Sequence, residues 1–348
     1  MTTSSTSKLQ LPHKKLAWSV SGGIEALGTL SHIPFHLLFT DADAITEAYL
    51  RGVPLARELF GPDVSLSPPR WAAISYGHIN CLGSQLIFPT ESEVAHTPLF
   101  HSLADAICTL EKEIDFTRTG LFSHYLNLWK TLKKRFPQEN IPFGGFGAEG
   151  PVTTAWLLRG HAFFTDLYDD PLSVCRYLEL VTTSVIRYKQ LICRINGDST
   201  PTANGISVED DGAALIAPGN WPRFVVPYLD RCFSALTGGP RSAHIEGLCV
   251  DHLRFLDQLH IAHFDPSVSP KLSPKTIRSH AKVYFTWRLN EVDTATMTVP
   301  ETENWVARAA ADGAPAVRTG IWRNNCTKQA AANIRAFCRC CKELNGTA

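Results

Sequence analysis

The chain has 348 residues, of which 44% are apolar and 19% are charged, the composition of an ordinary globular protein. Lys plus Arg and Asp plus Glu both number 33, so the net charge is zero and no overall field favours nucleic acid or an anionic membrane as a partner. No apolar run approaches the roughly 18 residues of a membrane span, and residues 1–15 lack the apolar stretch of a secretory signal. We therefore expect a cytoplasmic protein whose ten cysteines are mostly free.

The predicted elements change in character along the chain. Residues 1–15 are rich in Ser and Thr and are expected to form a disordered tail, whereas residues 16–136 are expected to be mostly helical. From residue 141 onward, short apolar runs alternate with amphipathic helices, which indicates a parallel sheet covered by helices. Because no linker is visible, we predict one domain over residues 16–345, with an α/β fold: a single (β/α)8 TIM barrel with extra N-terminal helices.

Polar residues mark the carboxyl ends of the predicted strands, although parallel strands buried on both faces are nearly all apolar. The predicted strand ends are Glu149, Asp210, Glu246, Asp265, Asn290 and Thr319. In a (β/α)8 barrel such ends converge on one mouth, where active sites lie. A single polar residue at a strand end is equally well explained as the N-cap of the next helix, and Asp211 and Asp265 fit that alternative best.

The sharpest candidate site is AHIEG, residues 243–247. Residues i and i+2 of a strand share a face, so we expect His244 and Glu246 to point together at the barrel axis. Histidine and carboxylate are both good zinc ligands, and Cys326 is the best candidate for a third. Without a metal, the same pair is an acid–base couple, with Asp210 orienting the substrate. The plain alternative is a core histidine hydrogen-bonded to a glutamate.

Other residues around the proposed mouth are candidates for substrate binding. His78 could donate to a substrate carboxylate, and a buried packing histidine is the alternative. Trp287 and Trp322 could wall a pocket, or they fill the core. The remaining polar candidates are Glu149, Asp211, Arg288 and Asn290. The sequence contains no phosphate-loop, dinucleotide-binding, nucleophile-elbow or HExxH motif.

Several segments in order resemble the uroporphyrinogen decarboxylase-like superfamily, over residues 30–343. Residues 147–160 (GAEGPVTTAWLLRG) and 166–171 (DLYDDP) are similar to its "GP-T…G…DLY-DP" segment, and residues 206–231 are similar to its "D…ISP…F…PYL" segment. FDPSV at residues 264–268 and the closing residues 319–337 match as well. The resemblance implies a (β/α)8 barrel and one of three activities: metal-free porphyrinogen decarboxylation, methyl transfer between corrinoid proteins and a thiol, or a related zinc-thiol alkyl transfer.

The same resemblance implies zinc ligands in the corrinoid- and zinc-dependent methyltransferase branch, which carries His-X-Cys-Gly where this chain has AHIEG. His244 matches the histidine, whereas Glu246 replaces the cysteine. The later cysteine of the branch corresponds to Ile321, and Cys326 lies five residues farther on. The decarboxylase branch carries an arginine-rich N-terminal segment where this chain has SGGIEALGTL, so decarboxylation in the haem pathway is not expected.

Three hypotheses of function remain open. The first is a Zn²⁺-dependent methyl or alkyl transferase with His244, Glu246 and Cys326 as ligands. The second is a metal-independent lyase or decarboxylase of a specialised metabolite that uses His244, Glu246 and Asp210 as acid–base groups. The third is a binding protein on a retired enzyme scaffold. The expected partner is a small-molecule substrate, without nucleic acid or membrane, and assembly as a homodimer is left open.

Overall fold

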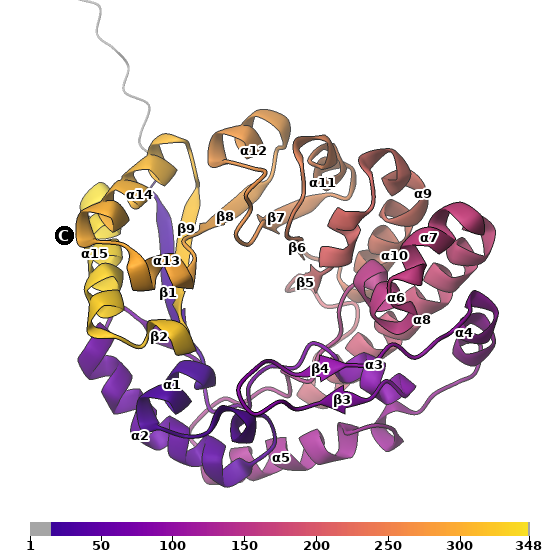
Figure 1. Cartoon of the computed structure of the whole chain (residues 1–348), viewed down its shortest axis with the longest axis horizontal. Helices are drawn as coiled ribbons and strands as arrows, with labels where there is room; N and C mark the ends of the chain where they lie inside the picture. Colours follow the sequence, from indigo (N-terminus) through magenta and orange to yellow (C-terminus); the bar gives the residue numbers. More distant parts are fainter. Residues whose placement is uncertain (1–14, 347–348) are drawn as a thin grey trace, which may run out of the picture.

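The computed structural model describes residues 15–346 as a curled parallel sheet with helices around it (Figure 1). Seven strands form the sheet in the spatial order β2-β1-β9-β8-β7-β6-β5. Their bounds are β1 Ala17–Gly22, β2 Ser65–Leu66, β5 Ile206–Glu209, β6 Arg241–His244, β7 Ile261–Asp265, β8 Tyr284–Arg288 and β9 Ala316–Ile321. This confirms the predicted α/β fold of TIM-barrel type. The predicted tail falls on residues 1–14, which lie outside the described residues, and on Lys15.

Two extended segments continue the barrel wall where the regular sheet stops beyond β5. The backbone N–H of Gly150 donates to the carbonyl of Glu209 at 2.5 Å, and Ile74 forms a parallel bridge with Phe146. A short antiparallel hairpin of β3 (Leu86–Ile87) and β4 (Ala95–His96) lies across the centre of the molecule from β7 and β8 (Figure 1).

Helices alternate with the strands and end at recognisable signals. Thr298 and Glu301 form a capping box at the start of α14, and Gly197 ends α8 in the left-handed conformation. The helices are α1 Ile24–Ser31, α2 Ala42–Phe60, α3 Gly77–Leu82, α4 Leu103–Leu110, α5 Phe122–Arg135, α6 Pro151–Arg159, α7 Ala162–Asp169, α8 Pro171–Asn196, α9 Trp221–Phe224, α10 Val226–Leu236, α11 Arg254–Gln258, α12 Pro274–His280, α13 Glu291–Thr296, α14 Val299–Ala311 and α15 Lys328–Leu344. Among residues 15–346, none of these helices combines the length and the apolar character of a bilayer span.

A strand near the N-terminus is an exception to the helices expected over residues 16–136. Residues Ala17–Gly22 form β1, which lies between β2 and β9 and pairs with both. Val20 and Gly22 are buried, whereas Ser19 and Ser21 are exposed. The alternation has period two, but it spans only six residues and rests on small side chains, so it gives little hydrophobic contrast to detect.

The concave face of the sheet is polar and accessible. Ser19 and Ser21 on β1 and Ser207 on β5 are exposed, whereas Val20 and Val208, which point to the other face, are buried. The expectation of strands that are apolar on both faces is therefore wrong, because only the face beneath the helices follows that rule. Polar side chains are presented along the strands and not only at their ends.

Candidate active site

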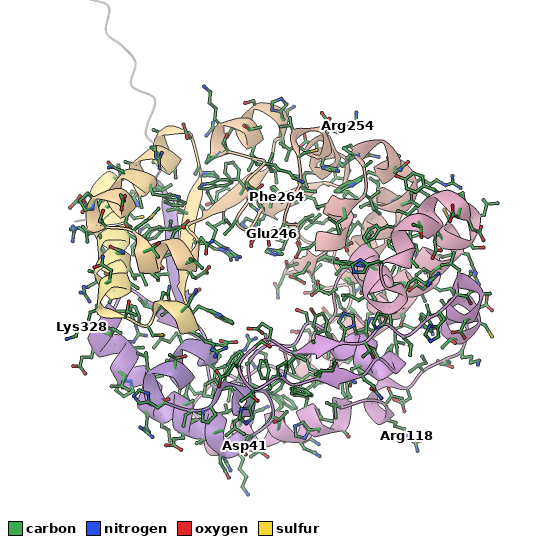
Figure 2. All side chains as sticks on the ribbon, in the orientation of Figure 1. Asp41, Arg118, Glu246, Arg254, Phe264 and Lys328 are labelled. Carbon is green, nitrogen blue, oxygen red and sulfur yellow. The ribbon has the colours of Figure 1, made fainter. Side chains whose placement is uncertain are left out.

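Four charged side chains meet near the carboxyl ends of four neighbouring strands. His244 ends β6, Asp265 ends β7, Arg288 ends β8, and Arg318 lies on β9. His244 is the register partner of Asp265, and Arg288 is the register partner of Arg318. Ion pairs join them all, so they share the concave face, and we call these four residues the strand-end cluster. Figure 2 labels Glu246, two residues beyond His244, at the inner edge of these strands.

Asp265 is the centre of the strand-end cluster. Its Oδ2 accepts hydrogen bonds from His244 Nδ1 at 2.8 Å, Arg318 Nη2 at 2.6 Å and Arg288 Nη2 at 3.2 Å. Its Oδ1 accepts from the backbone N–H of Ser267 at 3.0 Å. Burial alone would raise the pKa of Asp265, but the hydrogen bond and charge of His244 and the charge of Arg288 outweigh it and hold the pKa below its ordinary value. Asp265 is thus a stable carboxylate that orients three cationic groups.

His244 is held for proton exchange. Its Nδ1 bonds Asp265, and its Nε2 lies 3.9 Å from Asp211 Oδ1. Burial lowers the pKa of His244, but the hydrogen bond to Asp265 and the charges of Asp265 and Asp211 act more strongly together, so the pKa lies above its ordinary value. Because the side chain is still 22% exposed, its protonated Nε2 can give a proton to a bound molecule.

The two arginines keep unused hydrogen-bond donors. In the described part of the chain, each guanidinium makes one hydrogen bond, to Asp265, and Arg288 Nε is buried without a partner. Arg318 is 36% exposed and Arg288 21%. Arg288 and Arg318 carry like charges on neighbouring strands and share one carboxylate oxygen of Asp265. Binding a further anion would therefore reduce the repulsion between them. A carboxylate or phosphate group fits guanidinium donors in this arrangement.

The predicted pairing of His244 with Glu246 is not what the structure shows. Strand β6 ends at His244, and Glu246 lies beyond it with its side chain exposed. The backbone N–H of Glu246 donates to Asp211 Oδ1 at 2.6 Å. The rule that residues i and i+2 share a face holds only inside a strand, so it does not apply to Glu246. The acidic partner of His244 is Asp265.

The three proposed zinc ligands are not brought together. Within residues 15–346, no group of three or more His, Cys, Asp or Glu side chains is arranged to hold a metal ion. Cys326 Sγ donates to the carbonyl oxygens of Trp322 and Ala26, at 3.2 and 3.7 Å, and burial raises the pKa of this thiol to about 12. His244 already bonds Asp265 through one ring nitrogen. The residues present therefore do not fit the set His244, Glu246 and Cys326 around zinc.

Asp210 lies behind the sheet and is fully buried. Its Oδ2 accepts from the N–H of Val152 at 3.2 Å, and its Oδ1 accepts from the N–H of Thr153 at 2.6 Å, both in the first turn of α6. Burial raises the pKa of Asp210 to about 6 despite these hydrogen bonds. A Cβ at Gly150 would come within 2.5 Å of the Asp210 side chain, so the packing here is tight. This geometry gives Asp210 the role of a clamp between β5 and α6.

Replacing Asp210 with alanine is expected to lower the free energy of unfolding by about 1–3 kcal/mol, because two buried N–H groups lose their acceptor. Urea denaturation measures the loss, with the exposed Asp169→Ala on α7 as the control. Because the folded-state pKa is raised to about 6, wild-type stability should fall as pH rises from about 4 to 6, and Asp210→Asn should remove that component. Unchanged stability with a large loss of turnover would instead place Asp210 in catalysis.

His78 and Asn290 have structural partners. His78 Nε2 lies 2.8 Å from Ser184 Oγ, the residue is 1% exposed, and burial lowers its pKa to about 3. It packs against Phe116 and Tyr188, so it cannot contact substrate without a rearrangement of this core. Asn290 caps α13 by accepting from the N–H of Val292 at 2.9 Å.

The two tryptophans lie on different elements, Trp287 on β8 and Trp322 in the turn after β9. Trp287 alternates with Arg288 along β8, so it points to the opposite face, where it packs against the core. Trp322 follows β9 and precedes a 3₁₀ turn at Arg323–Asn325, where its N–H donates to Asn325 Oδ1 at 2.7 Å. The extension of β9 to Ile321 also corrects the predicted strand end at Thr319.

Glu149 occupies a different part of the mouth. It lines a cavity of about 160 Å³ together with Tyr76 and Glu93. Burial raises the pKa of Glu149 to about 7, while a hydrogen bond from Ser75 acts in the opposite direction. Glu149 is therefore a weak acid that exchanges its proton near neutral pH, and its role as a substrate-binding residue stays a prediction.

Asp265 and Arg318 were not predicted as site residues. From the sequence, Asp265 is best explained as a helix cap, and Arg318 is not among the candidate site residues. A charged residue at the corresponding position of successive predicted strands is the signal that could have identified these residues. Arg288 and Arg318 are such residues, since both lie at partly accessible positions of largely apolar runs. Register, which a single sequence does not show, is what joins these charges.

Comparisons with known proteins agree with this architecture. The family model described as uroporphyrinogen decarboxylase (URO-D) matches residues 74–284. The chain is similar in structure to a methyltransferase from Methanosarcina mazei, with a TM-score of 0.68, 18% identity, and coverage of 96% of this chain and 95% of that chain. It also aligns with a B12-independent methionine synthase from Shewanella sp. W3-18-1, with a TM-score of 0.47, 12% identity, and coverage of 95% and 97%. A search of curated proteins finds no match.

Proposed function

Because the chain belongs to the uroporphyrinogen decarboxylase (URO-D) family, we propose that it is a lyase of the decarboxylase type that acts on a small anionic metabolite at the strand-end cluster. The observation that carries this proposal is the arrangement of His244, Arg288 and Arg318 around the single carboxylate of Asp265. The family and the fold support an enzyme, and the cluster supplies both an anion site and a proton donor.

Substrate binding falls to the two arginines. Their unused N–H donors bind a carboxylate or phosphate group that remains in the product. Asp265 fixes both guanidinium groups by accepting one hydrogen bond from each, so little conformational entropy is lost when the substrate binds.

The chemical step requires one proton. When the bond between the substrate carbon and its second carboxylate breaks, CO₂ leaves and the electron pair stays on the carbon. Protonated His244 then gives its Nε2 proton to that carbon, while Asp265 holds the ring through Nδ1 and stabilises its charged form before the transfer. Solvent restores the proton afterwards, because His244 is partly exposed.

The test is a screen of small di- and tricarboxylic acids and phosphorylated carboxylic acids for CO₂ release by the purified chain. The proposal expects CO₂ release from at least one compound, and it expects His244→Asn to lower the rate of that release by about 10²- to 10⁴-fold. A substrate that the variant converts as fast as the wild type would remove His244 from the reaction.

Methyl or alkyl transfer to a thiol through zinc is the second reaction class that the superfamily resemblance implies. It needs ligands in addition to His244 that the described residues do not group around it. Metal analysis of protein purified without chelator separates the two classes. One zinc per chain that is lost in His244→Asn would favour transfer over decarboxylation.

Anion binding can be tested before a substrate is known. Malonate is expected to raise the Tm of the wild type, and Arg318→Met is expected to weaken malonate binding about 10- to 100-fold, because a charge-assisted hydrogen bond is lost. Calorimetric titration measures the affinity. Arg241→Met is the matched control, since Arg241 begins β6 at the opposite end of the strand and pairs with Asp230. Equal malonate affinity in the two variants would rule out Arg318 as an anion ligand.

A further inference from the structure

A cysteine and a histidine form a hydrogen-bonded pair in the loop that follows β6. Cys249 Sγ lies 3.2 Å from His252 Nδ1, and His252 Nε2 lies 3.1 Å from the carbonyl oxygen of Ile216. Cys249 is partly exposed, whereas His252 is 3% exposed. The pair therefore combines an accessible sulfur atom with a buried and oriented imidazole.

The carbonyl of Ile216 determines which ring nitrogen of His252 carries the hydrogen. A carbonyl oxygen only accepts, so Nε2 must be the donor, and the lone pair of the neutral ring then lies on Nδ1, facing Cys249. Burial lowers the pKa of His252, with Lys271 and Arg254 acting in the same direction and the Ile216 hydrogen bond and Asp251 opposing them. The ring is thus uncharged at neutral pH and ready to accept a proton.

We propose that Cys249 is a nucleophile that forms a thioether with small carbon electrophiles and that His252 is its general base. In the step, the thiol proton passes to His252 Nδ1, the sulfur forms a bond to the electrophilic carbon, and the leaving group departs with its electron pair. An adjacent base that is itself oriented by a third group is the arrangement that activates such nucleophiles. Because the loop follows β6, the adduct lies at the carboxyl end of the strands, the same end as the strand-end cluster.

A helix cap is the competing explanation of the pair. Cys249 is the N-cap of the three-residue 3₁₀ helix Val250–His252, and His252 Nδ1 also accepts from the Cys249 N–H at 3.1 Å. A cap alone would be served better by serine or aspartate, because sulfur is a weak acceptor. Capping therefore accounts for the rigidity of the pair and leaves the choice of cysteine unexplained.

Burial disfavours reaction at seven of the other cysteines. Burial raises the pKa of Cys81, Cys193, Cys232, Cys326, Cys338, Cys340 and Cys341, which disfavours the reactive thiolate. Cys108 on α4 is exposed, and no hydrogen bond to a histidine is recorded for it in the described residues. It is the natural internal control, since exposure alone would make it more reactive than Cys249.

Iodoacetamide is the probe, with the alkylation rate of each cysteine followed by peptide mass spectrometry at pH 7. Cys249 is expected to react at least about tenfold faster than the more exposed Cys108. His252→Gln keeps an acceptor for the Cys249 N–H but provides no base, so it should slow Cys249 at least about tenfold and leave Cys108 unchanged. Cys249→Ser should keep the cap and the Tm. Cys249 reacting no faster than Cys108 in the wild type would overturn the proposal, and so would an unchanged Cys249 rate in a folded His252→Gln variant.

Discussion

Replacing Asp265 with asparagine is expected to lower the free energy of unfolding by about 3–5 kcal/mol, because two arginines and a histidine lose the carboxylate that they share in a largely buried position. Urea denaturation at pH 6 measures this loss directly and needs no substrate. Asparagine has nearly the same size, so the effect reports charge and hydrogen bonding and not a cavity.

The difference in the free energy of unfolding between the wild type and Asp265→Asn depends on pH through two pKa shifts of opposite sign. The pKa of Asp265 is held below its ordinary 3.8, so its contribution is present above that value and is lost as pH falls through the folded-state pKa. The pKa of His244 is raised above its ordinary 6.5, so its contribution is complete below 6.5 and is lost as pH rises through the folded-state pKa. The stability difference between wild type and Asp265→Asn should be largest between about pH 4 and pH 6.5.

Asp230→Asn is the matched control. Asp230 pairs with Arg241 at 2.7 Å, but its side chain is 53% exposed, so its loss should cost no more than about 1 kcal/mol. If Asp265→Asn proved as mild as this surface change, the strand-end cluster would be a solvated set of charges without a structural centre.

Replacing His244 with asparagine is expected to lower turnover by about 10²- to 10⁴-fold on the substrate that the CO₂-release screen identifies, because the proton donor is lost. Malonate affinity should change far less, since Arg288 and Arg318 remain in place. In the wild type the protonated form is active, so turnover should fall as pH rises through the raised pKa of His244, and this dependence should disappear from the residual activity of the variant.

His263→Asn separates catalysis from general damage to the sheet. His263 lies on β7 two residues before Asp265, and its Nε2 is 2.9 Å from Thr286 Oγ1. It therefore has a similar environment without a bond to the carboxylate of the cluster. Equal losses of turnover in the two variants would mean that His244 acts through packing alone.

The sequence predicted the fold well because its signal was local and repeated. The alternation of short apolar runs with amphipathic helices from residue 141 onward predicted the parallel sheet that the structure shows. Strand β1 was missed because Ser19, Ser21 and Gly22 give little contrast between its two faces. A short strand of small residues is recognised from the strands that it pairs with, because its own composition gives no clear hydrophobic pattern.

The site was predicted in part, for a related reason. His244 and Arg288 were candidate site residues, but the strand ends were predicted two residues later, at Glu246 and Asn290. Their shared partner Asp265 was assigned to a helix cap. That assignment is wrong, because the next helix, α12, has Ser273 as its N-cap. One oxygen of Asp265 accepts from the backbone N–H of Ser267 in a non-helical segment, and the other joins the ion pairs. Pairing across strands depends on register, and β6 and β7 are offset by an irregularity between Arg241 and Ser242 that no single sequence reveals.

The polar concave face can exchange its side chains at little cost in stability. Ser19, Ser21 and Ser207 are exposed, so replacing them removes little packing and should cost little stability. Val20 and Val208, by contrast, are buried on the face beneath the helices, where an apolar side chain is needed for packing. Along one strand, residues on the concave face and residues beneath the helices alternate. Related proteins can therefore differ in the exposed residues while they keep the buried residues on which folding depends.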